Sequence, residues 1–219
     1  DWKGCSISTI KIGGIITAPQ RYLILNNMFL SNVDIIKAVK KGDITIKPFD
    51  KSRLQPASYD ILLGNKFILT ESHATEVIDP VKKKFAKTSE IILKKGKTFA
   101  LHPGVSILGI SVDYFGSKKY LVQLHGKSSL ARIGLLVHNT AGLINPGHFL
   151  CVTFELCNLN KVPIILTPNM RIGQITFSGM SSPPNEYYKY IPSKYIDGKW
   201  NSHIPPKASS KKSKRLKKK

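Results

Sequence analysis

The run from Gln123 to Leu156 gathers most of the side chains that could take part in chemistry. Strand-like segments begin and end it, and its polar groups lie at the joints between segments: Lys127, Ser128, Ser129, Arg132, His138, Asn145 and Glu155. Glu155 is the single carboxylate of the run and lies in the apolar stretch Cys151 to Cys157. Either Glu155 lies on the wet face of an alternating strand, or it lies in a partly dry pocket and transfers protons near neutral pH.

The segment Gly126 to Ser129 could bind phosphate. A Walker phosphate loop is excluded, because that pattern needs a glycine five residues before its Gly-Lys pair and this chain has Leu121 there. Backbone amides, hydroxyl groups and the charge of Lys127 could still bind phosphate oxygens. A hairpin turn with solvated hydroxyls fits the residues equally well.

Catalytic zinc is not expected. Zinc-dependent deaminases of bases carry His-x-Glu together with Pro-Cys-x-x-Cys, and neither pattern occurs in this chain.

Short β-like runs separated by turn signals predict a mainly β domain, either a sandwich or a barrel. A short helix should begin at the capping sequence Ser31 to Asp34 and end at Gly42. Pro56 and Gly64 should bracket a short strand. The other expected strands are residues 44–46, 67–69, 77–78, 91–93, 98–101, 105–112, 162–166 and 171–177.

Composition limits the class of protein. The chain has 219 residues, 42% of them hydrophobic, which is enough for a substantial core in one domain or two small ones. Three cysteines without paired spacing indicate a reducing compartment, and a cytoplasmic location is expected. No apolar run is long enough for a membrane-spanning helix, so no membrane partner is expected.

The net charge of +21 is unevenly distributed. Eight of the basic residues lie in Lys207 to Lys219, which leaves +13 for the rest and would steer an anionic ligand to a basic pocket. We expect residues 201–219 to be a disordered tail that binds polyanions, including nucleic acid, non-specifically; a nuclear address or an RNA contact is the alternative. Residues 1–27 are interpreted as an extension of unknown role, followed by a module that begins near Met28.

Four motifs in order carry a family resemblance: Gly126 to Leu135 (GKSSLARIGL), His138 to Gly147 (HNTAGLINPG), Phe154 to Leu156 (FEL) and Met170 to Ile175 (MRIGQI). Together they resemble the dCTP deaminase branch of the dUTPase superfamily. Further matches occur in the expected order, at Leu30-Ser31, Ile46 to Phe49, Gln55 to Asp60, Leu101 to Gly104 and Ser193 to Tyr195. The resemblance covers residues 28–200.

The resemblance implies a fold, an assembly and a reaction. The expected subunit is a distorted, jelly-roll-like β-barrel with a short N-terminal helix, and three subunits form a homotrimer with active sites at their interfaces. The expected reaction is the zinc-independent deamination of dCTP to dUTP and ammonia for dUMP and dTTP biosynthesis. Mg²⁺ would accompany the triphosphate, and dTTP is a possible inhibitor.

The resemblance also implies roles for individual residues. Glu155 would be the general acid and base, Ser128 and the carbonyl of Ala141 would position the water, and Arg132 would orient this group from a neighbouring subunit. Phosphates would be bound by Lys127, Ser129, Lys194 and Tyr195. The rest of the nucleotide would be contacted by Thr140, Gly142, Asn145 and Gln174.

Three positions depart from the family pattern, and they leave the product open. Asn145 stands where the family has aspartate, Leu150 where it has glycine, and Gly198 where it has glutamine. An amide cannot act as a base, so Asn145 argues against a second, diphosphate-releasing step. Thr140-Ala141-Gly142 nevertheless resembles the bifunctional members that release dUMP. A bifunctional enzyme and a catalytically impaired nucleotide-binding homologue are therefore the alternatives.

Overall fold

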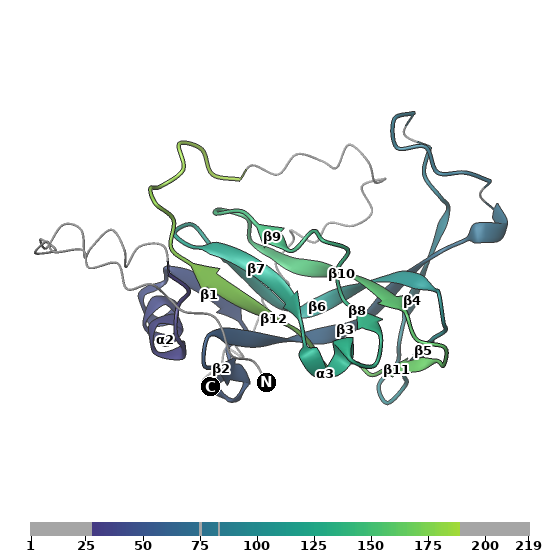
Figure 1. Ribbon diagram of the computed structural model, residues 1–219, viewed down its shortest axis with the longest axis horizontal. Coiled ribbons are helices and arrows are strands. Elements are labelled where there is room, and N and C mark those ends of the chain that lie inside the picture. Colours follow the sequence, from purple (N-terminus) through teal and green to yellow (C-terminus); the bar gives the residue numbers. More distant parts are fainter. Residues whose placement is uncertain (1–27, 75, 83, 189–219) are drawn as a thin grey trace, which may run out of the picture.

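The computed structural model describes residues 28–74, 76–82 and 84–188, and this part of the chain is mainly β-structure (Figure 1). The predicted fold class is confirmed. The helices are α2 (Asn32–Lys41) and α3 (Ser128–Ala131), with 3-10 turns η1 (Lys51–Arg53) and η2 (Ser72–Ala74). The strands are β1 (Ile44–Lys47), β2 (Leu54–Gln55), β3 (Ser58–Thr70), β4 (Thr88–Ile92), β5 (Phe99–Leu101), β6 (Ser106–Ser117), β7 (Leu121–Gly126), β8 (Leu135–Leu136), β9 (Leu143–Ile144), β10 (Leu150–Asn158), β11 (Ile164–Leu166) and β12 (Arg171–Ser178).

Some regions named from the sequence lie outside the described residues. These are the extension 1–27, the basic tail 201–219, the candidate phosphate ligands Lys194 and Tyr195, and Gly198. Within the described ranges, none of the helices has the length and apolar character needed to cross a membrane.

Helix α2 has the predicted boundaries. The Ser31 hydroxyl accepts a hydrogen bond from the backbone N–H of Asp34 at 3.4 Å, which satisfies one of the free donors of the first turn. Gly42 ends the helix with a φ of 82°, a left-handed conformation that glycine adopts without steric cost. Ile35 and Ala38 are buried, so the helix packs one face against the core.

One antiparallel sheet forms the body of the described chain. Its main path runs β8-β10-β6-β3-β12-β7-β9, while β1 pairs with β6 and both β2 and β4 pair with β3; β11 and β5 form a separate two-stranded sheet. The end strands β8 and β9 are consecutive in sequence, and residues 137–142 alone join them. Six linking residues reach about 25 Å at most, so the sheet must curl until its two ends approach each other.

The strand β10 shows how the sheet divides core from surface. Leu150, Val152, Phe154 and Leu156 are buried, whereas the residues between them are only partly buried. This alternation places Glu155 on the face opposite the core. The core itself contains five fully buried aromatic side chains, namely Tyr59, Phe67, Phe115, Phe154 and Phe177.

The short strand expected between Pro56 and Gly64 is wrong, because β3 continues through Gly64 to Thr70. Glycine is required at position 64 because the backbone of β6 passes close to it, and not because the chain turns there. A Cβ on Gly64 would lie 2.7 Å from the backbone oxygen of Ile110, at a point where the β3–β6 register shifts between Leu63 and Phe67. Glycine inside a strand is typical of such irregularities.

Replacing Gly64 with alanine should therefore lower the free energy of unfolding by about 1–3 kcal/mol. The added methyl group meets backbone, which cannot move without disturbing β6. Urea denaturation measures the loss. The matched control is Gly109→Ala, whose methyl group would meet the side chain of Leu156 at 3.0 Å instead of backbone and should cost less. Equal losses for the two variants would contradict the explanation.

Two other local predictions were wrong. Residues 77–78 are not in a strand, and nearby only an isolated bridge joins Asp79 to Lys84. The hairpin-turn interpretation of Gly126 to Ser129 is replaced by the helix α3. Lys127 is its extended N-cap, and the carbonyl of Lys127 accepts a hydrogen bond from the N–H of Ala131 at 2.9 Å.

Candidate active site

Three neighbouring strands position a row of polar side chains beside the segment Gly126–Ser129. On β12, Gln174 pairs with His125 of β7 on one side and with Asp60 of β3 on the other. Directly opposed residues of antiparallel strands share a face of the sheet, so these three side chains lie together. The adjacent row, Tyr59, Ile175 and Leu124, is buried and belongs to the core.

The sheet holds the segment Gly126–Ser129 at two successive residues. The Gln174 amide donates to the Gly126 carbonyl at 3.1 Å, and the Ser58 hydroxyl in turn donates to the Gln174 amide oxygen at 2.7 Å. The Lys127 ammonium lies 2.6 Å from a carboxylate oxygen of Asp60. Ser128 and Ser129 follow directly and are exposed, so their hydroxyls are accessible above a backbone that is held in place.

Glu155 is partly buried and is held by the segment that follows β8. Its backbone N–H donates to the Val137 carbonyl at 3.2 Å, and one of its carboxylate oxygens accepts the backbone N–H of Asn139 at 2.6 Å. A short hydrogen bond from an amide to a carboxylate is stronger than one between neutral groups and restricts the side chain. The candidate acid and base therefore has a defined orientation.

The segment 137–142 connects Glu155 to the other end of the sheet. The Gly142 carbonyl accepts the N–H of Leu124 of β7 at 2.7 Å, and a Cβ on Gly142 would lie 2.6 Å from the Leu124 oxygen. Between these anchors, Thr140 has a φ of 67°, which is unusual for a β-branched residue and is characteristic of functional loops. Ala141 is exposed in the middle of this loop.

Other candidate residues do not meet Glu155 within the described chain. No hydrogen bond or ion pair between described residues joins Ser128 or Arg132 to Glu155, and Arg132 is exposed at the end of α3. Asn145 is also exposed, in a turn where its carbonyl accepts the N–H of His148 at 3.0 Å. The chain therefore presents two groups of candidate residues, one around Gly126–Ser129 and one around Glu155.

Sequence reasoning missed two residues that hold these groups, Asp60 and Asn139. Asp60 could have been found by the argument used for Glu155, because it too is a carboxylate beside apolar strand residues, Tyr59 and Ile61. Asn139 contributes only its backbone N–H, so its side chain carries no signal.

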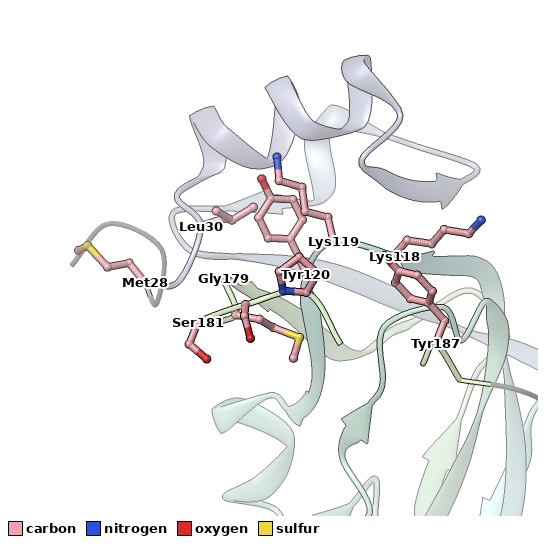
Figure 2. Close-up of a pocket in the computed structure, with 11 residues that line it drawn as sticks. Met28, Leu30, Lys118, Lys119, Tyr120, Gly179, Ser181 and Tyr187 are labelled. Atoms are coloured by element: carbon pink, nitrogen blue, oxygen red, sulfur yellow. The ribbon is translucent and has the colours of Figure 1, made fainter. Parts of the chain in front are cut away.

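A groove of about 450 Å³ lies elsewhere on the molecule (Figure 2). The lining residues labelled in Figure 2 are Met28, Leu30, Lys118, Lys119, Tyr120, Gly179, Ser181 and Tyr187. None of the candidate site residues lines it. The candidate active site is therefore distinct from this groove.

The described residues contain no group of three or more His, Cys, Asp or Glu side chains arranged to hold a metal ion. Asp60, the carboxylate nearest the Gly126–Ser129 segment, is already paired with Lys127 and with Arg171. An Mg²⁺ ion that is bound through substrate phosphates and water needs no such group.

His125 adds a pH-dependent group to the row. Its Nε2 lies 3.1 Å from the Thr176 hydroxyl oxygen, and burial lowers the pKa of its imidazole, with a smaller contribution from the nearby His138. A lowered pKa in the folded state means that the unfolded chain binds this proton more tightly. The contribution of His125 to stability is thus complete above its unfolded pKa of 6.5 and is lost as the pH falls through the lower folded pKa.

We expect the melting temperature to decrease when the pH is lowered from 7.5 to 5.5. The decrease should be smaller in the His125→Gln variant. Differential scanning calorimetry at the two pH values measures the effect. The other histidines are present in both proteins. An identical pH dependence in the variant would contradict the assignment to His125.

Comparison with known proteins shows the family of this chain. Residues 29–180 match the family model described as dCTP deaminase-like. A protein of Tropheryma whipplei (strain Twist), named "dCTP deaminase, dUMP-forming", is 44% identical over 162 residues, which cover 74% of this chain and 83% of that protein. A protein of the same name from Dictyoglomus thermophilum is 41% identical over 177 residues, covering 78% of this chain and 91% of that protein.

A solved structure shares the fold. The 2'-deoxycytidine 5'-triphosphate deaminase from Agrobacterium tumefaciens superimposes with a TM-score of 0.56 and 19% identity, over 71% of this chain and 49% of that chain. The curled antiparallel sheet is therefore a dCTP deaminase fold. The chain belongs to the dCTP deaminase-like family and is an enzyme.

Proposed function

We propose that this chain deaminates dCTP hydrolytically and goes on to release dUMP and diphosphate. The observation that carries the proposal is the partly buried Glu155 carboxylate, held by the Asn139 N–H at 2.6 Å beside the loop that contains Ala141. The relatives described above are named dUMP-forming, which favours the bifunctional alternative over dUTP as the final product.

Glu155 removes a proton from water as the oxygen attacks C4 of cytosine. It then delivers protons to N3 and to the departing amino group, so that dCTP and water become dUTP and ammonia. The Ser128 hydroxyl and the Ala141 carbonyl hold the water, and preorganised groups of this kind lower the barrier without reorganising. A second water then attacks the α-phosphorus of dUTP and gives its proton to solvent, the bond from the α-phosphorus to the bridging oxygen breaks, and the β- and γ-phosphates leave together as diphosphate.

The active enzyme is a homotrimer in which Ser128 and Arg132 of one subunit complete the site around Glu155 of its neighbour. Two observations support this assembly. Arg132 makes no side-chain hydrogen bond or ion pair with any described residue of its own chain, and the apolar side chains of Ile133 and Leu143 near the candidate residues are 44% and 57% exposed. Mixing Arg132→Ala subunits with Glu155→Gln subunits should restore part of the activity that each lacks alone.

The nucleotide is bound mainly through its phosphates. Lys127 and Ser129 contact the triphosphate, together with Lys194 and Tyr195, and Mg²⁺ reaches the site bound to those phosphates. The remaining contacts come from Thr140, Gly142, Asn145 and Gln174. A dTTP molecule offers the same triphosphate without the exocyclic amine, so it would compete for the site as an inhibitor.

One observation favours a second candidate function, a nucleotide-binding homologue with impaired chemistry. Asn145 is an amide at the position where the family has aspartate, and an amide cannot deprotonate water. Leu150 and Gly198 also depart from the family pattern, and if these departures together prevent deamination, the protein would bind dCTP without converting it.

Incubation of the purified protein with dCTP and Mg²⁺, followed by separation of nucleotides and measurement of ammonia, distinguishes these functions. Formation of dUMP and diphosphate is the expected result. Accumulation of dUTP alone would overturn the second step, and Asn145→Asp should then increase the share of dUMP. Binding of dCTP without ammonia release would identify the impaired homologue.

A further inference from the structure

We propose that Asp60 is a positioning residue that holds Lys127 in place for the triphosphate. The inference rests on the proposed function, and it concerns a carboxylate to which neither the sequence nor the family comparison assigns a role. Asp60 lies on β3, two strands away from β7, whose end carries Lys127. Its side chain is only 1% exposed.

Two cations share the Asp60 carboxylate. One oxygen lies 2.6 Å from the Lys127 ammonium, and the other lies 3.3 Å from a guanidinium nitrogen of Arg171. The Gln55 amide also donates to Asp60, at 3.4 Å. A carboxylate is costly to bury unless charged partners and hydrogen bonds compensate it. Removing Asp60 takes away the ion pair of Lys127, whereas Arg171 still donates to the Ser52 carbonyl at 3.2 Å.

The contact with Lys127 has a direct consequence for the candidate phosphate site. Lys127 is the N-cap of α3 and immediately precedes Ser128, and its own side chain makes no capping hydrogen bond. Gln174 holds the Gly126 carbonyl and Asp60 holds Lys127, so successive residues are attached to the sheet before the nucleotide arrives. A lysine side chain that is already ordered loses less conformational freedom when a phosphate binds.

A purely electrostatic view of Asp60 predicts the opposite result. One carboxylate and two cations leave this cluster with one net positive charge, and neutralising Asp60 would raise it by one. If only the local charge mattered, Asp60→Asn would attract an anionic nucleotide more strongly. If Asp60 positions Lys127, the same variant binds the nucleotide more weakly. The direction in which Asp60→Asn changes the affinity for the nucleotide therefore distinguishes the two explanations.

The experiment compares steady-state kinetics with dCTP for the wild type, Asp60→Asn, Lys127→Gln and the double variant. We expect Asp60→Asn to raise KM by about 3- to 10-fold, with a smaller change in kcat. The double variant should have a KM close to that of Lys127→Gln alone, because Asp60 acts through Lys127. An unchanged or lowered KM, or independent effects of the two substitutions, would overturn the proposal.

Asp43→Asn is the matched control. Asp43 lies 3.1 Å from Lys119 in an ion pair outside the candidate site, so its loss should leave KM unchanged. Thermal melting of every variant reports folding. If Asp60→Asn does not fold, Asp60→Glu replaces it in the comparison. Glutamate keeps the negative charge but displaces the Lys127 ammonium. A KM of this variant within about twofold of the wild-type KM would overturn the proposal.

Failure of the proposed function gives a different pattern. If the wild type does not release ammonia, the dissociation constant for dCTP with Mg²⁺, measured by calorimetry, replaces KM in the same comparison. A weaker affinity of Asp60→Asn would then support the positioning role in a non-catalytic protein. Absence of dCTP binding by the wild type would overturn both proposals.

Discussion

Replacing Glu155 with glutamine is expected to reduce ammonia release from dCTP by about 10²- to 10⁴-fold, the usual contribution of a positioned general acid and base. Glutamine keeps an oxygen that can accept the Asn139 N–H but cannot take a proton from water. The fold should therefore persist, with KM changed much less than kcat. Initial rates of ammonia release measure the loss, and circular dichroism reports the fold.

The matched control for Glu155→Gln is Glu90→Gln. Glu90 is also a strand glutamate, 43% exposed on β4, where it pairs with Lys66 at 2.6 Å. Its replacement should leave ammonia release within about twofold of the wild type, because an exposed ion pair contributes little. If Glu155→Gln retained the wild-type rate, the proposed chemistry would be wrong.

The largest expected effect on stability follows from replacing Arg53 with methionine, which should lower the free energy of unfolding by about 3–5 kcal/mol. Arg53 and Asp113 form an ion pair of 2.7 Å in which their side chains are 4% and 0% exposed. Arg53 also donates to the Pro48 carbonyl at 2.7 Å. Methionine preserves much of the apolar volume but leaves Asp113 with an uncompensated charge.

The pH dependence of that loss tests its cause. Burial raises the pKa of Asp113, and the Leu62 N–H and Arg53 act in the opposite direction. Without Arg53 the pKa rises further. A raised folded-state pKa means stability that is present below the unfolded value of 3.8 and lost as the pH rises through the folded pKa. The deficit of Arg53→Met should thus be larger at neutral pH than under acidic conditions.

Urea denaturation at several pH values checks this prediction. Arg53→Met combined with Asp113→Leu removes both charges and should recover part of the stability. Lys37→Met, which breaks an exposed pair with Asp34 at 3.3 Å, is the control and should have little effect. A deficit that is independent of pH would show that lost packing, and not the charge of Asp113, causes it.

Local patterns were sufficient to predict several elements of this fold. The capping residues Ser31 and Gly42 delimit α2 because their side chain and backbone satisfy the ends of a helix, whatever surrounds it. The alternation along β10 left two interpretations of Glu155, and the structure places it partly buried on the face away from the core. Local signals misled at Gly64, because the reason for that glycine is the distant carbonyl of Ile110.

The sequence by itself determined the family, the mainly β class and the segments that carry the candidate chemistry, because these follow from residue types and short spacings. Only the tertiary structure decided which groups hold the candidate residues in place. Asn139 lies sixteen residues before Glu155, and Asp60 lies sixty-seven residues before Lys127, yet each pair is within hydrogen-bonding distance. Curling of the sheet and strand register create these contacts, and spacing along the chain carries no information about either.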